Sequence, residues 1–200
     1  MKILGIESSS LVASAAIVTD DILTAEYTVN FKKTHSQTLL PMIDEIVSMT
    51  ETDLNEIDAI AVSGGPGSFT GLRIGSATAK GLGLALKKPL IHIPTVDALA
   101  YNLWGAANLV CPIMDAKRNQ VYTGIYRMKD GLQAVKEQCP MDMRRLMEAL
   151  NGLGEPVICL GDGQIKIPVE LLRSRVIVGV DHSGLGRIGD LVALFYHMPR

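Results

Sequence analysis

Hydrophobic and polar residues along the first half of the chain follow first the spacing of strands and then that of helices. Three short apolar runs bounded by polar residues have the length of β-strands. A longer segment then repeats Leu39, Ile43 and Ile46 at helical spacing. We predict three strands, a helix, a strand, a helix, a strand and a helix, in that order, at residues 3–6, 14–18, 25–31, 36–49, 59–62, 71–86, 90–93 and 95–104.

After Ala106 the same order begins again, although its pattern is weaker. We predict strands at residues 110–115, 121–126, 132–137, 157–160 and 175–178, helices at residues 143–150 and 185–197, and a short helical stretch before the last strand. A pattern that occurs twice predicts two related α/β lobes, residues 1–106 and 107–200, which divide near residues 105–108.

Three meandering strands followed by alternating helices and strands, in two copies, is the plan of the actin–Hsp70–sugar-kinase superfamily. We therefore predict an α/β fold of two actin-like (ribonuclease H-like) lobes with a duplicated βββαβα(β)α order and a reduced second lobe. Members of that superfamily bind nucleotide between their lobes. Because one fold serves many functions, the activity has to be argued from the site.

Composition and charge narrow the class of protein. The chain has 200 residues, of which 48% are hydrophobic and 20% charged, which is enough to bury a core. No apolar run approaches the roughly 18–20 residues of a membrane span. The net charge of −2 gives no basic field, so any contact with RNA is expected to be indirect or shared with a partner.

The cysteines and the N-terminus indicate a cytoplasmic protein. Cys111, Cys139 and Cys159 are odd in number and form no CxxC pair, which is typical of reduced, buried thiols rather than of disulfides or metal ligands. The first ten residues lack the longer apolar core of a secretory signal.

A glycine-rich stretch, SGGPGSFTGLRIG at residues 63–75, stands between a predicted strand and a predicted helix. Gly65 and Gly67 adopt positive φ at little steric cost, and we expect Thr70 to cap the helix. Free backbone N–H groups at such a helix start can bind phosphate. The stretch matches neither a Walker loop nor GxGxxG, so a phosphate site and a tight structural turn both stay open.

The helix after this loop carries small residues every four positions, Gly71, Gly75, Ala79 and Gly83, in addition to Gly81. Each glycine inside a helix costs about 1 kcal/mol relative to alanine, so the smooth face needs a compensating contact. That contact is either the chain's own sheet or neighbouring helix, or another protein chain.

Several segments together resemble the bacterial TsaB (YeaZ) family. They are IESSSLVASAAIV, THSQTLLPMIDEI, SGGPGSFTGLRIGSATAKGLGLAL, IPTVDALA and MDAKRNQVYTGIY, in the family's order and spacing. The resemblance is strong over residues 1–127 and weaker beyond. GPGSFTGLRIG is its most specific part.

The resemblance implies a subunit without catalysis of its own that assembles with TsaD, its catalytic paralogue, and contacts the ATPase TsaE. It implies tRNA binding only through that complex, and a homodimer when the chain is isolated. The first-lobe helices, residues 36–49 and 71–86, would form the partner face. The corresponding interface residues are His35, Leu39, Ile43, Gly71, Gly75, Ala79 and Gly83.

The same comparison predicts that no metal is bound. TsaD-type proteins carry a His-x-x-x-His metal motif where this chain has Thr95 and Leu99. Leucine is not a metal ligand, Thr95 is interpreted as a helix cap, and His92 has no partner four residues on.

The first predicted hairpin is a second candidate for nucleotide contact. Glu7, Ser8 and Ser9 stand where the superfamily places an acidic residue and hydroxyl groups near phosphate, but a hairpin turn with solvated serines is the favoured interpretation. Together with Gly65 and Gly67 they form the candidate phosphate set. We expect no tightly bound cofactor and at most weak binding of ATP or ADP.

Two functions other than a scaffold would each require particular residues. An active phosphotransferase or ATPase would need carboxylates in the cleft, for which Glu7, Asp115 and Asp162 are the candidates. A peptidase would need HExxH or a nucleophile–histidine pairing, which the sequence lacks. Lys117 and Arg118, in a predicted turn, are either solvated or in contact with a partner or tRNA.

Overall fold

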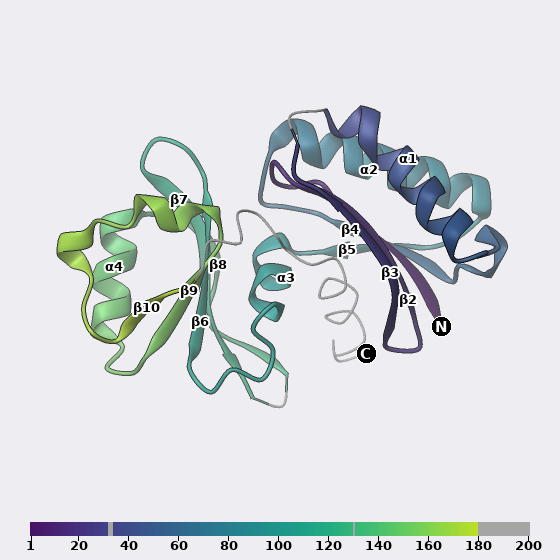
Figure 1. Ribbon diagram of the computed structural model, residues 1–200. Coiled ribbons are helices and arrows are strands. Elements are labelled where there is room, and N and C mark those ends of the chain that lie inside the picture. Colours follow the sequence, from purple (N-terminus) through teal and green to yellow (C-terminus); the bar gives the residue numbers. More distant parts are fainter. Residues whose placement is uncertain (32–33, 130, 180–200) are drawn as a thin grey trace. The chain divides into compact units, whose positions relative to one another are not determined.

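The computed structural model describes residues 1–31, 34–129 and 131–179 (Figure 1). These residues fall into two compact units, the first containing Met1–Ala98 and the second beginning at Leu99. Among the described residues, no helix is long and apolar enough to cross a membrane. The predicted lobes, 1–106 and 107–200, reach into residues that are not described, so their boundaries stay a prediction.

The first unit is built on one five-stranded sheet in the order β3-β2-β1-β4-β5. Strands β1 to β3 form an antiparallel meander, and β4 and β5 run parallel to β1. The strands are β1 (Lys2–Glu7), β2 (Ala13–Thr19), β3 (Ile22–Val29), β4 (Ala59–Ser63) and β5 (Leu90–Ile93).

Two long helices, α1 (His35–Met49) and α2 (Phe69–Leu86), cover the same face of this sheet (Figure 1). Their apolar side chains pack with Leu4 and Ile6 of β1 in one buried cluster, to which α1 contributes Leu39 and Ile43. The short turn η1 (Leu54–Glu56) leads into β4, and helix α3 (Thr95–Tyr101) follows β5.

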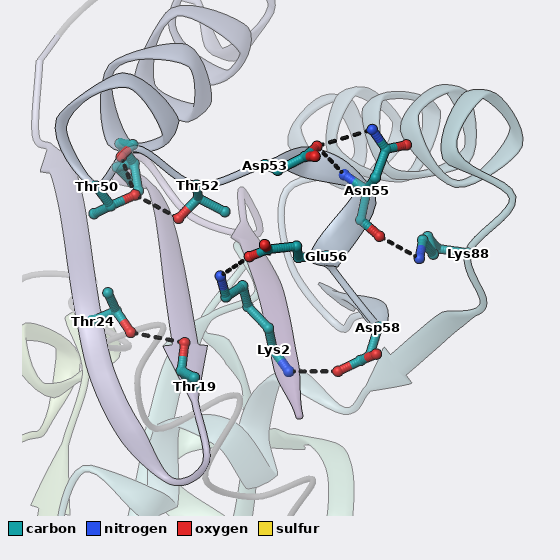
Figure 2. A network of polar contacts seen from close by, with 11 residues as sticks. Lys2, Thr19, Thr24, Thr50, Thr52, Asp53, Asn55, Glu56, Asp58 and Lys88 are labelled. Carbon is teal, nitrogen blue, oxygen red and sulfur yellow. Dashed lines mark hydrogen bonds and ion pairs between the residues drawn. The ribbon is translucent and has the colours of Figure 1, made fainter.

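Polar contacts close the end of this sheet at which β1 begins (Figure 2). The ammonium group of Lys2 lies 2.7 Å from Glu56 Oε2, and the Lys2 backbone N–H donates to Asp58 Oδ2 at 2.7 Å. Lys88 Nζ donates to the carbonyl oxygen of Asn55 at 2.8 Å. Because β1 and β4 are parallel, the glycine-rich loop that follows β4 lies at the other end of the sheet.

The second sheet repeats the order of the first. Its strands pair as β8-β7-β6-β9-β10, so each strand has a counterpart five places earlier, and the predicted duplication is confirmed. They are β6 (Leu109–Asp115), β7 (Gln120–Met128), β8 (Leu132–Asp142), β9 (Val157–Leu160) and β10 (Val176–Val178).

Helix α4 (Met143–Gly152) follows β8, but two short turns, η2 (Asp162–Lys166) and η3 (Val169–Leu171), replace a helix between β9 and β10. This is the expected reduction of the second lobe. The predicted helix at residues 185–197 lies outside the described residues.

Several predicted element ends differ from those observed. Helix α2 begins earlier because Ser68, not Thr70, is its N-cap and accepts from the Gly71 N–H at 3.3 Å. Thr34 is the N-cap of α1, but its hydroxyl lies 3.1 Å from Ser36 Oγ and makes no hydrogen bond to a helix N–H. Helix α3 ends at Tyr101, because the next residues continue as tighter turns with i→i−3 bonds.

The three cysteines are free, as predicted, and two of them are neighbours. Cys111 on β6 and Cys159 on β9 are paired in register and fully buried. A hydrogen bond with Cys111 and burial both raise the pKa of the Cys159 thiol. Both side chains therefore belong to the core of the second unit, and their pairing could not be read from their separation along the chain.

Candidate functional site

The first hairpin turn begins with a buried carboxyl group. Glu7, the last residue of β1, is only 5% exposed, and its Oε1 accepts the Ser9 backbone N–H at 2.5 Å. Burial raises the pKa of Glu7 above its ordinary value, and hydrogen bonds from Ser9 and Ser63 offset only part of that rise. The predicted solvated turn is therefore wrong for Glu7, Ser8 and Ser9, all of which are buried.

The glycine-rich loop is bonded directly to this turn. The Ser68 backbone N–H donates to the Ser9 carbonyl oxygen at 2.6 Å, and the Ser8 hydroxyl donates to the Gly71 carbonyl oxygen at 2.9 Å. His35, the first residue of α1, donates from Nε2 to the Ser10 carbonyl oxygen at 2.8 Å. The hairpin turn thus holds the starts of both long helices.

Thr95, which we interpreted as a helix cap, holds the other side of the glycine-rich loop. Thr95 accepts the Gly65 N–H on its Oγ1 at 3.1 Å, and its own N–H donates to the Gly65 carbonyl oxygen at 2.8 Å. Gly65 has φ +106°, which explains why glycine is needed there. Thr95 therefore fixes the glycine-rich loop through two hydrogen bonds to Gly65, and its side chain is buried.

Hydrogen bonds within the chain reduce the number of backbone N–H groups that the glycine-rich loop could offer to a phosphate. The structure does bring Ser9 beside Gly67, where an added Cβ would lie 2.4 Å from the Ser9 carbonyl oxygen. Yet the N–H groups of four loop residues already donate within the chain, and Pro66 has none; the four are Gly64, Gly65, Ser68 and Gly71. Nucleotide binding stays a prediction, and the bonding favours the tight structural turn.

The small-residue face of α2 points inward. A Cβ added to Gly71 or Gly75 would collide with Ser8, and one added to Gly83 would lie 2.8 Å from Leu90 Cδ2. Ala79 is fully buried in the same cluster as the β1 side chains. Of the two open interpretations, packing against the chain's own sheet is the correct one for this face.

Most of the expected interface residues lie in this interior, although partner binding itself stays a prediction. Leu39 and Ile43 are also buried in the first core, and His35 is half-buried against Ser10. Side chains without exposed surface cannot line a docking face of the folded chain. A partner face on α1 and α2, if these helices carry one, has to use their opposite sides.

The outward face of α2 carries exposed apolar and basic residues at helical spacing. Phe69 is 68% exposed and Leu84 is 83% exposed, and between them the helix presents Arg73, Ala77 and Lys80. The Arg73 guanidinium lies 3.9 Å from the centre of the Phe69 ring. A hollow of about 330 Å³ is lined by Phe69, Leu72, Arg73, Ser76, Ala77 and Lys80.

Gly81 belongs to this outward face of α2, which we call the outer helix face. Nothing lies within 4 Å of a Cβ added to Gly81. Internal packing therefore does not explain this glycine, although it costs helix stability. The spacing pattern singled out the inner glycines, which recur every four residues, and Gly81 falls outside that pattern.

In the second unit, the carboxyl group proposed for a phosphotransferase is engaged by lysines. Asp115 forms ion pairs with Lys166 and Lys117, and Asp162 Oδ1 accepts the Asp115 backbone N–H at 3.0 Å. Burial opposes ionisation, but the two lysines outweigh it and lower the pKa of Asp115. Asp115 is thus a paired carboxylate that orders its own loop.

The positions that correspond to the metal motif of the catalytic paralogue are filled by buried side chains. Thr95 is bonded to the glycine loop, and Leu99 is buried. Within residues 1–31, 34–129 and 131–179, no group of three His, Cys, Asp or Glu side chains is placed to hold a metal ion.

Comparison with known proteins identifies relatives of this architecture. A family model described as "TsaD: tRNA N6-adenosine threonylcarbamoyltransferase" matches residues 25–187. The Bacillus subtilis (strain 168) "tRNA threonylcarbamoyladenosine biosynthesis protein TsaB" is 36% identical over 163 residues, which is 80% of this chain and 71% of that protein. The Escherichia coli (strain K12) protein of the same description is 35% identical over 129 residues, 64% of this chain and 55% of that protein.

Solved structures agree on the fold. YeaZ from Pseudomonas aeruginosa superposes with a TM-score of 0.81 at 24% identity, over 96% of this chain and 89% of that one. The order of motifs, the duplicated sheets and the extent of the match to the Bacillus subtilis protein lead to one conclusion: the chain belongs to the TsaB (YeaZ) family.

Proposed function

We propose that this chain is a non-catalytic scaffold subunit in the biosynthesis of tRNA N6-threonylcarbamoyladenosine, and that it binds and activates a TsaD-like catalytic subunit. The observation that supports this most is the outer helix face, where Phe69 and Leu84 are exposed around Arg73 and an unexplained Gly81. Exposed apolar side chains with a basic residue and a smooth stretch of helix suit close packing against another helix.

The groups that an enzyme of this fold would use are engaged in holding the chain together. Glu7 is buried behind Ser9, four N–H groups of the glycine loop donate within the chain, and Asp115 is paired with lysines. The function is therefore binding and positioning. The partner supplies the transfer chemistry, a TsaE-like ATPase joins the complex, and tRNA is bound in the cytoplasm through the assembly.

The first experiment mixes the chain with a TsaD-like partner and measures the mass of the complex by size-exclusion light scattering. We expect a one-to-one complex that Leu84→Asp and Gly81→Leu abolish, because each places a charge or bulk on the outer helix face. Val135→Asp is the matched control, since Val135 is an exposed apolar residue of the second unit. If the complex still forms with both Leu84→Asp and Gly81→Leu, the outer helix face is not the partner-binding surface.

We propose that the same face also forms a homodimer of the isolated chain, which Leu84→Asp should convert to a monomer. Steady ATP turnover by the chain alone, lost in Asp115→Asn, would instead favour the phosphotransferase or ATPase alternative. We expect no such turnover.

A further inference from the structure

The turn between β6 and β7 has an unusual backbone. Lys117, Arg118 and Asn119 follow one another with φ of +65°, +49° and +60°. This left-handed region suits glycine and asparagine and is unfavourable for lysine and arginine, whose Cβ crowds the carbonyl oxygen. The turn therefore keeps two long basic side chains where backbone preference alone would select against them, a conflict typical of functional positions.

Hydrogen bonds from its base hold this turn in shape. Asp115 Oδ1 accepts the Lys117 N–H at 2.6 Å, and Asp115 is itself held by Asp162. The Gln120 N–H donates to the Lys117 carbonyl oxygen at 2.9 Å. The basic side chains thus project from a fixed support.

Two more arginines stand beside the turn. The Met143 N–H, at the start of α4, donates to the Asn119 carbonyl oxygen at 3.2 Å, which places the next residues, Arg144 and Arg145, near the turn. We call Lys117, Arg118, Arg144 and Arg145 the basic patch; all four are exposed.

Nearby carboxylates neutralise part of this charge, and one of them, Asp115, pairs with the Lys117 ammonium group at 3.3 Å. Asp142 directs its Oδ1 to the backbone N–H groups of Arg144 and Arg145, and Glu170 lies 3.9 Å from the Arg144 guanidinium. In the described part of the chain, Arg118 and Arg145 form no ion pair. The patch is thus locally positive in a chain whose net charge is −2.

The turn and α4 contribute no exposed large apolar side chain to the patch, although Ile165 and Val169 are exposed on η2 and η3, next to Lys166 and Glu170. The apolar residues of α4 beside the patch, Met143, Leu146 and Met147, are buried. Protein interfaces have an apolar core, whereas contacts with nucleic-acid backbones are made by arginine, lysine and polar groups. The chemistry favours a phosphate backbone over a protein surface.

We propose that the basic patch contacts the phosphate backbone of the tRNA while the tRNA is held by the assembled complex. This inference rests on the proposed function, because four basic side chains on a chain of net charge −2 are too few to hold RNA alone. The contact adds affinity and orientation without reading sequence.

The test measures binding of an unmodified tRNA transcript to the complex with the TsaD-like partner over a range of salt concentrations. Arg118→Gly removes a charge and suits the left-handed backbone, so we expect the magnitude of the slope of log Kd against log salt to fall by about 1. Arg118→Gly combined with Arg145→Gln should lower it by about 2. The effect should be equal for tRNAs of different sequence.

Two controls isolate the charge. Asn119→Gly makes a similar backbone change in the same turn, and Lys129→Ser removes a lysine just beyond the opposite end of β7. Both should leave the affinity and the slope unchanged.

An unchanged slope in the Arg118 and Arg145 variants, with the complex intact by light scattering, overturns this inference and leaves the proposed function standing. Variants that loosen the protein complex without changing the slope overturn it too, and assign the patch to protein contact. If the wild-type complex does not form, the proposed function fails, and the inference, which rests on it, is overturned with it.

Discussion

The Ser8 hydroxyl donates to the carbonyl oxygen of Gly71 at 2.9 Å and so fastens the first hairpin to the start of α2. The same side chain fills the space beside Gly75. Two residues 63 positions apart thereby decide which face of α2 is inward. The glycines on that face are consequences of a close approach between the helix and the hairpin.

Gly75→Ala should therefore destabilise the chain by about 1–3 kcal/mol, because the added methyl group collides with Ser8 Oγ. Ser8→Ala removes that oxygen, so the double variant should be more stable than the sum of the two single changes predicts. Urea unfolding of the four proteins measures this coupling. Strict additivity would show that Ser8 is not what restricts Gly75.

Gly81→Ala should have the opposite effect in the isolated chain. Its added Cβ meets nothing within 4 Å, so the gain in helix propensity, about 0.5–1 kcal/mol, appears undiminished. Gly83→Ala is the matched control, because it brings the same gain but places a Cβ 2.8 Å from Leu90 Cδ2 and 3.2 Å from the Lys88 carbonyl oxygen. The midpoint of thermal unfolding should be higher for Gly81→Ala than for wild type, and lower for Gly83→Ala than for Gly81→Ala.

The sequence predicted the strands and helices well because their signal is local. The duplicated order, the glycine loop and the helix with small residues every four positions could all be recognised from spacing. The inward face of α2 could not, because glycine and alanine carry almost no polarity, and the partner that buries them, Ser8, is distant in sequence. Thr95 was interpreted as a cap for a similar reason, since its bond to Gly65 depends on tertiary structure.

Thr95→Val should cost about 1–3 kcal/mol, because it leaves the buried Gly65 N–H without its hydroxyl acceptor while preserving side-chain shape. Thr95→Ser keeps the hydroxyl and should recover most of that loss. Thr24→Val is a suitable control, since Thr24 is exposed and its hydroxyl donates only to Thr19 at 3.0 Å; it should stay within about 0.5 kcal/mol of wild type. Equal losses for Thr95→Val and Thr95→Ser would mean that packing, and not the hydroxyl, secures the loop.

Glu7 makes the stability of the chain depend on pH in a direction that distinguishes it from ordinary surface carboxylates. Burial raises its pKa in the folded state, so the folded protein binds this proton more tightly than the unfolded chain does. The contribution of Glu7 to the free energy of unfolding therefore falls as pH rises from about 4.5, the ordinary value, through the folded pKa.

Glu7→Gln removes this titration while retaining an oxygen that accepts from the Ser9 N–H. The difference in unfolding free energy between Glu7→Gln and wild type should shift in favour of the variant as pH rises across that window, and then level off above the folded pKa. Urea unfolding at a series of pH values measures it, and taking the difference cancels the titration of every other group. A difference that stays constant with pH would mean that Glu7 titrates alike in the folded and unfolded chain, and that water reaches its carboxyl group despite the surrounding hairpin.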